Sequence, residues 1–392
     1  MHILLIAPKY HGYTYGQNYF FNLGIAYISA VLKKEGHDVS CLNTFHIPQV
    51  PNCLEKSILK CVDSRGNIDL VGISGLSSMY AFVSEAVAAT RRVSPESLIA
   101  VGGNVATTMP ESIILDLPID YAILGEGELP VIELIRALES NESFEAIQSL
   151  AYRHGKRVIV NQPGSGINEL DSIPFPDFEG FEFGEYLKRY CSQGHYSYID
   201  NPRPMPLLMS RSCPRHCTFC YHPPQHKYRQ RSVLNAITEV DYMIDKFNIN
   251  IVEIYDEILF TSFNRERIFE LCAYFQERKL LWGCQVMVDA VDEDILMTMK
   301  DSGCQTVSYG IENISPRILK SMRKGMSLSK ITEVLETTYK VGLDIQGNIL
   351  FGDSEETWES ALENLSWWLA NRKYCLNILP ITLVQNKYLN FI

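Results

Sequence analysis

Three features that would narrow the function of this chain at once are scarce: long hydrophobic runs, basic charge and a secretion signal. No apolar stretch in the 392 residues approaches the roughly 20 that a helix needs to cross a bilayer. Residues 1–8 lack the basic start of a signal peptide and indicate a strand instead. Asp and Glu number 46 against 35 Lys and Arg, a net charge of −11, whereas nucleic-acid binding depends on neutralising phosphates. We therefore expect no membrane span and no nucleic-acid partner.

Internal repeats and low-complexity tracts are also absent from the sequence. With 46% hydrophobic and 21% charged residues, the chain has the composition of a globular protein and the length for two domains. Eight of its eleven cysteines are scattered, mostly within apolar segments. Scattered cysteines suit a reducing compartment, where they behave as small buried apolar residues. We therefore expect a cytoplasmic protein.

The remaining three cysteines, Cys213, Cys217 and Cys220, form a C-x3-C-x2-C motif just after the apolar run 206–209. A tight loop with this spacing brings three thiolates toward one point. A [4Fe–4S] cluster usually takes four cysteine ligands, so three would leave one iron open to a substrate or cofactor. The motif therefore predicts an open iron–sulfur site.

Two other interpretations of the same cysteines stay open at this point. His216, His222 and His226 lie nearby, so a zinc site with three Cys and one His is possible, although such sites more often show two cysteine pairs. A disulfide with a spare thiol would require an oxidising compartment.

Residues 1–140 alternate between strand and helix patterns, which favours a parallel sheet with helices on both faces. Ligands of such sheets bind beyond the carboxyl ends of the strands. Three predicted strand ends carry small or polar residues, which let a large flat ligand approach the backbone, although each could also be an ordinary tight turn. The candidate binding residues there are Ser74, Ser77, Gly102, Gly103, Gly125 and Glu126.

The rest of the chain divides into a hairpin at 148–160, a segment at 161–203 rich in Pro, Gly and aromatic residues, and six further strand–helix units from residue 206. The aromatic content of 161–203 predicts that it packs down as a connection between domains. Six such units predict a partial parallel barrel, with chemistry at the carboxyl ends of its strands. We expect domains at 1–145, 146–203 and 204–392.

Several motifs together resemble the cobalamin (B12)-binding radical S-adenosylmethionine (radical SAM) enzymes. The cysteine motif with Phe219 is the most specific of them. In the predicted barrel, the others are Tyr255–Ile258, Ser308–Glu312 and Gly347–Gly352; in the N-terminal region, they are Leu23–Ala30, Gly36–Val39, Val101–Gly103 and Leu124–Glu128.

The resemblance implies an α/β protein in which a Rossmann-like parallel-sheet B12-binding domain precedes a partial (β/α)6 radical SAM barrel. It implies that the three thiolates hold a [4Fe–4S] cluster, that SAM chelates the open iron, and that SAM is cleaved to a 5′-deoxyadenosyl radical. It also implies an external electron donor of the flavodoxin or ferredoxin type and a small-molecule or peptide substrate. The residues implied near SAM are Phe219, Asp256, Glu257, Glu312 and Asn348.

For several of these residues a structural role is the alternative: core packing for Phe219, helix capping for Asp256 and a strand-end ion pair for Glu312. The sequence also departs from its relatives. It has no D-x-H-x-x-G motif to supply a cobalt-ligating histidine, and Met287 stands where relatives often carry Arg. An aromatic loop after the first strand could pack under the corrin ring or line the substrate path; its residues are Tyr10, His11, Tyr13, Tyr15 and Tyr19.

The function that this resemblance favours is methylation of an unactivated carbon or phosphorus centre, with cobalamin as the methyl carrier. The alternatives are a cobalamin-dependent cyclisation or rearrangement without methyl transfer, a radical SAM enzyme that no longer binds B12, and a non-catalytic cobalamin- or redox-binding module. A tRNA methylthiotransferase is disfavoured, because Cys41, Cys53 and Cys61 lack the spacing of a second cluster site.

Overall fold

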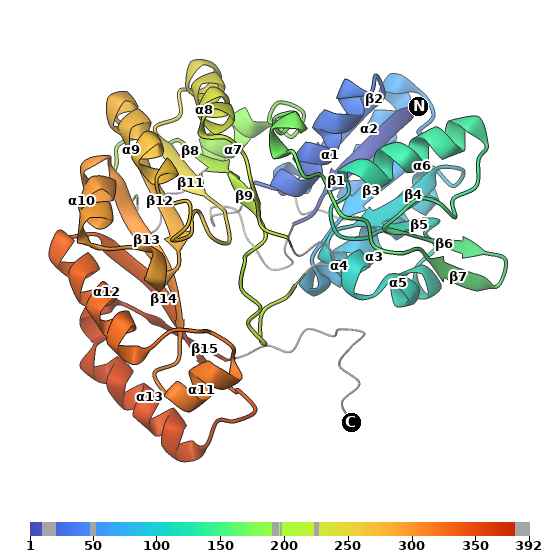
Figure 1. The fold of residues 1–392 in the computed structure, drawn as a ribbon. Coiled ribbons are helices and arrows are strands. Elements are labelled where there is room, and N and C mark those ends of the chain that lie inside the picture. Colours follow the sequence, from blue (N-terminus) through green and yellow to red (C-terminus); the bar gives the residue numbers. More distant parts are fainter. Residues whose placement is uncertain (10–20, 48–51, 190–195, 197, 223–226, 381–392) are drawn as a thin grey trace. The chain divides into compact units, whose positions relative to one another are not determined.

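The computed structural model describes the chain except for residues 10–20, 48–51, 190–195, 197, 223–226 and 381–392. The chain forms two compact units (Figure 1). Residues 1–191 make the first, and most of the residues from 192 to 383 make the second. The expected boundaries at 145 and 203 stay a prediction.

The first unit is built on a seven-stranded sheet in the order β2-β1-β3-β4-β5-β6-β7. The first five strands in the chain are parallel, and the hairpin of β6 and β7 extends the sheet in antiparallel fashion beyond β5. The alternating pattern and the hairpin predicted from the sequence are both present. The strands are His2–Ala7 (β1), Asp38–Asn43 (β2), Leu70–Ser74 (β3), Leu98–Gly102 (β4), Tyr121–Ile123 (β5), Leu150–His154 (β6) and Arg157–Val160 (β7).

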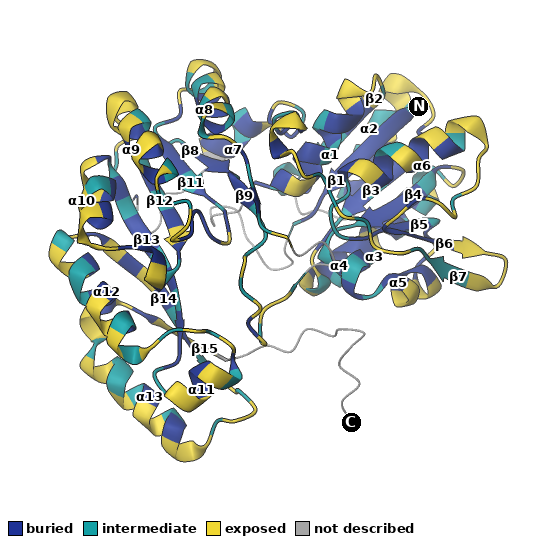
Figure 2. Cartoon of the chain, in the orientation of Figure 1, coloured by how far each residue is buried: buried dark blue, intermediate teal, exposed yellow. Residues whose placement is uncertain are grey.

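Helices cover both faces of this sheet, and β1, β3, β4 and β5 are largely buried between them, whereas the β6–β7 hairpin is partly exposed (Figure 2). Leu4 and Ile6 of β1 belong to a core cluster that also contains residues of α2, α3 and α5. Outside this cluster, helices α1 and α6 pack against each other. The helices are Leu23–Lys34 (α1), Cys53–Arg65 (α2), Tyr80–Val93 (α3), Asn104–Thr108 (α4), Pro110–Asp116 (α5), Glu128–Ser140 (α6) and Phe183–Arg189 (α7).

The described part of the aromatic segment 161–203 packs down, as its composition predicts. The rings of Phe178 and Phe183 lie 5.1 Å apart, and both lie within 5.4 Å of Phe21. Asp177 anchors the segment to α1, because its carboxylate accepts hydrogen bonds from Lys33 Nζ (2.6 Å) and from the Ser29 hydroxyl (2.5 Å). Burial alone would raise the pKa of Asp177, but these partners hold it below its usual value.

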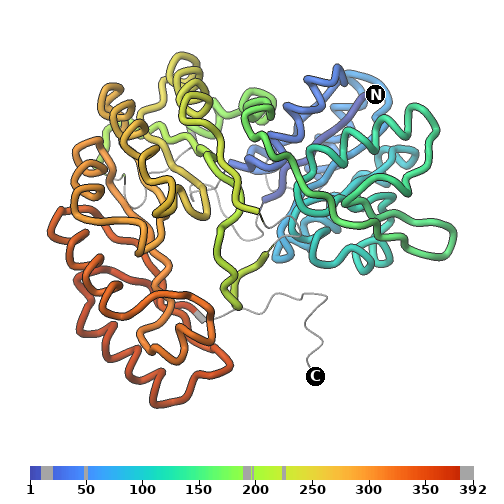
Figure 3. Tube along the Cα trace, in the orientation of Figure 1, coloured from blue at the N-terminus to red at the C-terminus, as the bar shows by residue number. Residues whose placement is uncertain are grey.

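The second unit is built on six parallel strands in the order β15-β14-β13-β12-β11-β8, so each strand pairs with the one before it in the chain. This succession, traced from yellow-green to red in Figure 3, is the predicted partial barrel. Its strands are Pro204–Leu207 (β8), Ile251–Ile254 (β11), Leu281–Val286 (β12), Cys304–Glu312 (β13), Asp344–Phe351 (β14) and Asn377–Pro380 (β15); a two-stranded ribbon of Ser210–Arg211 (β9) and Arg229–Gln230 (β10) follows β8.

Two helices of the second unit begin at a side chain that caps them. The Asp292 carboxylate accepts from the Ile295 amide (3.1 Å) at the start of α10, and the Ser232 hydroxyl caps α8 in the same way (3.0 Å). The helices are Val233–Phe247 (α8), Arg267–Arg278 (α9), Glu293–Asp301 (α10), Pro316–Ser321 (α11), Leu328–Val341 (α12) and Trp358–Ala370 (α13). Short 3-10 helices occupy Thr44–His46, Ser77–Met79, Leu170–Ser172, Val288–Ala290 and Arg372–Tyr374.

Within the described residues, no helix has both the length and the apolar character that crossing a bilayer requires.

Two glycines that follow helices of the barrel allow a direct test of its packing. Gly303 and Gly342 both have positive φ, +94° and +81°, but only at Gly303 would a Cβ collide with backbone, the carbonyl of Leu280. We expect Gly342→Ala to lower the free energy of unfolding by about 1–2 kcal/mol, the cost of left-handed backbone, and Gly303→Ala by about 3 kcal/mol. Urea unfolding followed by tryptophan fluorescence measures both, because all four tryptophans lie in the barrel at 282, 358, 367 and 368. Equal losses in the two variants would contradict the predicted collision.

Candidate functional site

The three clustered cysteines lie on the loop that follows β8 and β9, beyond the carboxyl end of the first barrel strand. Cys217 is buried, Cys213 is half-buried and Cys220 is exposed. The cysteines in the described part of the chain are all free thiols. The loop is compact, since the Cys220 amide donates to the Cys217 carbonyl (3.2 Å) and Ser212 before it adopts a positive φ of +68°.

Backbone contacts hold the middle of this loop against the end of α11. The Thr218 amide donates to the Met322 carbonyl (3.1 Å), and the Thr218 hydroxyl donates to the Ser321 carbonyl (3.3 Å). These bonds use carbonyls at the end of a helix, where no intrahelical donor remains to satisfy them. The position of the loop is therefore set by residues about 100 positions further along the chain.

Arg215 fixes the outer part of the same loop. Its guanidinium pairs with Asp289, and its Nε lies 3.5 Å from the Met287 sulfur. Gly325 leaves room for this side chain, because a Cβ there would lie 2.8 Å from Arg215 Nη1. Met287, which departs from the pattern of relatives, therefore contacts an arginine supplied by the cysteine loop.

The Cys217 thiol acts on the other two. Although Cys220 is exposed as a residue, desolvation around its thiol and then the charge of Cys217 raise its pKa to about 11. Burial is likewise the main cause that raises the pKa of Cys213, and Cys217 adds to it. Thiols with raised pKa values are protonated at neutral pH, so binding iron must release their protons. The donor set, three free thiols on one compact loop with Cys217 acting on the other two, fits an iron–sulfur cluster.

Two of the three histidines that the zinc alternative involves lie close together: the rings of His216 and His222 are 5.5 Å apart. The third, His226, lies outside the described residues. Across the described ranges, no three His, Cys, Asp or Glu side chains gather closely enough to hold a single metal ion.

Asp256 lies just past the carboxyl end of β11 and is 3% exposed. Its Oδ1 accepts from the Met209 amide (2.7 Å), which ties β11 to the segment just before the cysteine loop. Its Oδ2 is buried and has no hydrogen-bond partner among the described residues. Burial raises the pKa of Asp256 to about 7, against the opposing effects of the nearby Ser210 hydroxyl and the Met209 amide. Asp256 does not cap a helix, and its free oxygen is an acceptor suited to a ligand that donates hydrogen bonds.

The other residues implied near SAM lie on different strands of the same sheet: Glu257 after β11, Glu312 at the end of β13, and Asn348 within β14. Glu257 is exposed and follows Asp256, and its charge contributes to the raised pKa of Cys213 and Cys220. Asn348 of β14 is the register partner of Gly310 in β13, and its Oδ1 accepts from Asn377 (3.3 Å).

Glu312 ends β13 at an irregularity in the strand register and has a positive φ of +66°. Its Oε1 forms an ion pair with Lys324 Nζ at 2.8 Å. This is the strand-end ion pair that was the structural alternative for Glu312. Contact of Glu312 with SAM stays a prediction. Lys324 also lies over the ring of half-buried Phe219, with Nζ 5.7 Å from the ring centroid. Sequence reasoning missed Lys324, Arg215 and Thr218, because nothing in their local pattern shows which strand end they reach.

In the first unit, the structure brings the predicted strand ends together at one edge. β3, β4 and β5 are neighbours in the sheet, so Ser74, Gly102 and the residues after Ile123 lie side by side. The Ser77 hydroxyl donates to Asn104 Oδ1 (2.7 Å), and the Gly125 amide donates to the Thr107 hydroxyl (2.8 Å). Asn104 and Thr107 on α4 therefore link the three ends, a role that their sequence did not reveal.

The two glycines at the end of β4 differ in what they do for the fold. Gly103 has a φ of +82°, and a Cβ there would lie 2.7 Å from the Gly75 carbonyl, so the fold itself requires glycine. At Gly102 a Cβ would meet nothing closer than the Ile123 carbonyl at 4.0 Å. Packing within the protein therefore explains Gly103, whereas Gly102 leaves open space above the sheet edge.

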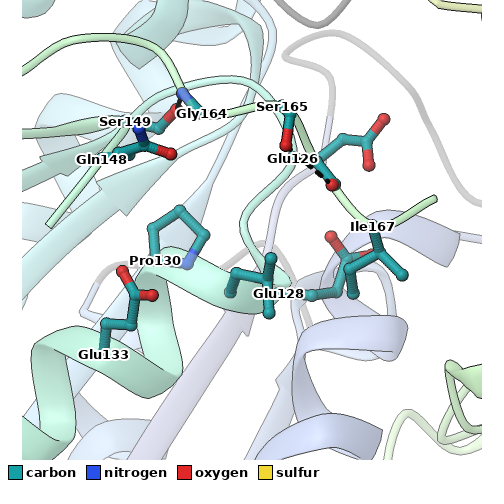
Figure 4. A pocket seen from close by; sticks show the side chains of 11 residues that line it. Glu126, Glu128, Pro130, Glu133, Gln148, Ser149, Gly164, Ser165 and Ile167 are labelled. Carbon is teal, nitrogen blue, oxygen red and sulfur yellow. Dashed lines mark hydrogen bonds between the residues drawn. The ribbon is translucent and has the colours of Figure 1, made fainter.

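Glu126 lines a small pocket of about 50 Å³ at the start of α6 (Figure 4). Glu128, Glu133 and Gln148 also line it, as do Gly164 and Ser149, which are joined by a hydrogen bond from the Gly164 amide to the Ser149 hydroxyl (2.8 Å). Its carboxylates favour hydrogen-bond donors and disfavour phosphate. The aromatic loop of Tyr10, His11, Tyr13, Tyr15 and Tyr19 lies outside the described residues.

Two protein families match this chain. The B12 binding domain matches residues 15–135, and the Radical SAM superfamily matches residues 207–365. The first match contains the sheet edge just described, and the second contains the cysteine loop. These matches define a cofactor-dependent radical enzyme, and they confirm the predicted fold and the predicted cofactors: cobalamin, SAM and a [4Fe–4S] cluster. The chain belongs to the cobalamin-binding radical SAM enzymes.

Curated relatives align over most of the chain. An uncharacterised methyltransferase of Pyrococcus horikoshii is 27% identical, covering 86% of this chain and 70% of its own. Cytidylyl-2-hydroxyethylphosphonate methyltransferase of Streptomyces wedmorensis is 28% identical, covering 85% and 69%. The anaerobic magnesium-protoporphyrin IX monomethyl ester cyclase of Synechocystis is 26% identical, covering 93% and 70%.

A solved structure has the same fold. TsrM of Kitasatospora setae, a radical SAM methyltransferase with cobalamin and a [4Fe–4S] cluster bound, superposes with a TM-score of 0.73 at 17% identity. The match covers 97% of this chain and 72% of TsrM.

The raised pKa of Asp256 predicts how stability depends on pH. Between the usual Asp pKa of 3.8 and about 7, the native state holds more protons than the unfolded state, so the free energy of unfolding falls as pH rises through this window. Asp256→Asn removes this dependence while its amide oxygen can still accept from Met209. We expect the stability of the variant relative to wild type to rise between pH 5 and pH 7.5, with exposed Asp301→Asn as control. Urea unfolding at both pH values tests this, and a constant difference between wild type and variant would show that Asp256 titrates normally.

Proposed function

We propose that this protein is a cobalamin-dependent radical SAM methyltransferase that methylates an unactivated carbon or phosphorus centre of a small-molecule or peptide substrate. The observation that carries the proposal is the three-thiol loop at the carboxyl edge of a six-stranded parallel sheet. Two of the aligned relatives bear methyltransferase names, and one of those names contains a phosphonate.

In this proposal, Cys213, Cys217 and Cys220 hold the cluster. The unpartnered Oδ2 of Asp256 accepts a hydrogen bond from the SAM amino group at the neighbouring strand end. When bound, the cluster supplies the electron that cleaves SAM to a 5′-deoxyadenosyl radical, and cobalamin carries the methyl group. The electron comes from an external donor of the flavodoxin or ferredoxin type.

In the first unit, Ser74, Ser77, Gly102, Gly103 and Gly125 form the edge against which cobalamin lies. Glu126 and its pocket accept hydrogen bonds from the amide side chains of the cofactor. The open space at Gly102 supports this assignment, because the fold does not itself need glycine there.

A second function from the same family is a cyclisation or rearrangement without methyl transfer, favoured by the aligned protoporphyrin ester cyclase. The products of SAM separate the two. Methyl transfer yields S-adenosylhomocysteine together with 5′-deoxyadenosine, whereas the second reaction yields 5′-deoxyadenosine alone. A non-catalytic binding module would cleave no SAM.

Replacing one cluster ligand tests the iron–sulfur assignment. We expect Cys217→Ala, reconstituted anaerobically with iron, sulfide and hydroxocobalamin, to lose its iron–sulfur absorption and to form 5′-deoxyadenosine only at the level seen without enzyme. Cys375→Ala, at an exposed cysteine remote in sequence from the loop, should behave as wild type. SAM cleavage that survives in the Cys217 variant would rule out this ligand set.

Adding a side chain at Gly102 tests the cobalamin edge. Gly102→Ala adds a Cβ that meets nothing closer than 4.0 Å, so we expect unchanged unfolding but hydroxocobalamin binding weakened by about tenfold or more, equal to about 1.4 kcal/mol. Gly24→Ala, at another glycine with open space around its Cβ, serves as control. Spectroscopic titration with hydroxocobalamin gives the affinity, and equal affinity in all three proteins would place the cofactor elsewhere.

A further inference from the structure

A nearly buried ion pair stands beside the cysteine loop, and no ligand role is assigned to its cation. Lys324 follows α11, and its Nζ lies 2.8 Å from Glu312 Oε1, with the two side chains 14% and 9% exposed. The Phe219 ring lies beneath the same ammonium group. Lys324 is thus held on two sides in one position.

The fold is shaped around this pair. At Gly310 a Cβ would lie 2.5 Å from both Glu312 Oε1 and Lys324 Nζ, so a side chain there would push the two charged ends aside. Glu312 adopts left-handed backbone at the strand irregularity, a conformation that costs a non-glycine residue of order 1 kcal/mol or more. A surface salt bridge forms without left-handed backbone and without a glycine beside it. These two features therefore distinguish the Lys324–Glu312 pair from an ordinary surface pair.

The ion pair lies against the cysteine loop itself. Lys324 Nζ lies 5.7 Å from the centroid of the Phe219 ring, and Phe219 stands in the loop directly before Cys220. Solvent and salt screen this pair little because it is nearly buried. Lys324 is therefore a fixed positive charge beside the loop that carries the three thiols, and Glu312 is a fixed negative charge next to it.

We infer that Lys324 is a positioning cation that sets the reduction potential of the cluster, with Glu312 as its counter-charge. Reduction adds one electron to the cluster, so a fixed cation nearby stabilises the reduced state and a fixed anion destabilises it. The inference rests on the proposed iron–sulfur site and adds a residue that the cysteine motif does not contain.

The test is an EPR-monitored redox titration of the reconstituted cluster, with dithionite as reductant and without SAM. We expect Lys324→Met to shift the midpoint potential to more negative values and Glu312→Gln to shift it to more positive values. Lys324→Arg, which keeps the charge, should stay near wild type. Lys330→Met is the matched control, because it removes a lysine of the same unit that pairs with Glu333 at 2.7 Å on α12.

Opposite shifts in the two variants support the inference, because a role in packing alone would not reverse sign with the sign of the charge removed. Shifts in the same direction, or none, overturn it. If Lys324→Met assembles no cluster, Glu312→Gln decides alone: a more positive potential supports the inference, and any other result overturns it. A wild-type protein that assembles no cluster would instead refute the proposed iron–sulfur site itself.

Discussion

The hydrogen bond from the Met209 amide to buried Asp256 is the contact on which the rest of the barrel site depends. It joins the ends of β8 and β11 four residues before Cys213, so it fixes where the cysteine loop begins. Thr218 and Arg215 then fix the loop further along, against residues that follow β12 and β13. Three thiols on a short loop would otherwise be free to turn away from one another.

Both units use the same physical rule. Parallel strands bring all their carboxyl ends to one edge, where backbone groups and the residues after each strand lie together. In the first unit this edge is linked by Asn104 and Thr107, and small residues keep space above it. In the second unit the edge carries thiols, carboxylates and one held ammonium group. The chemical difference between the two edges is thus a difference in side chains on a shared architecture.

Electrostatics at the barrel edge is dominated by burial. The pKa values of Asp256, Cys213 and Cys220 are all raised, chiefly by desolvation. A site that disfavours its own negative charges gains most from a bound cationic centre, because iron replaces the protons that the thiols otherwise retain. Lys324 adds a fixed positive charge beside this loop, held by Glu312 and by the ring of Phe219.

The sequence by itself determined the class of fold, and its cysteine motif predicted the cluster ligands. Periodicity separates strand from helix locally, and a motif within eight residues needs no tertiary contact to be recognised. Only the tertiary structure decided which residues hold that motif. Lys324, Asp289 and Met322 lie 69 or more positions after Cys220, so no local pattern links them to the loop. It also separated Gly103, which packing requires, from Gly102, which packing does not, because steric contact depends on neighbouring strands that sequence adjacency cannot show.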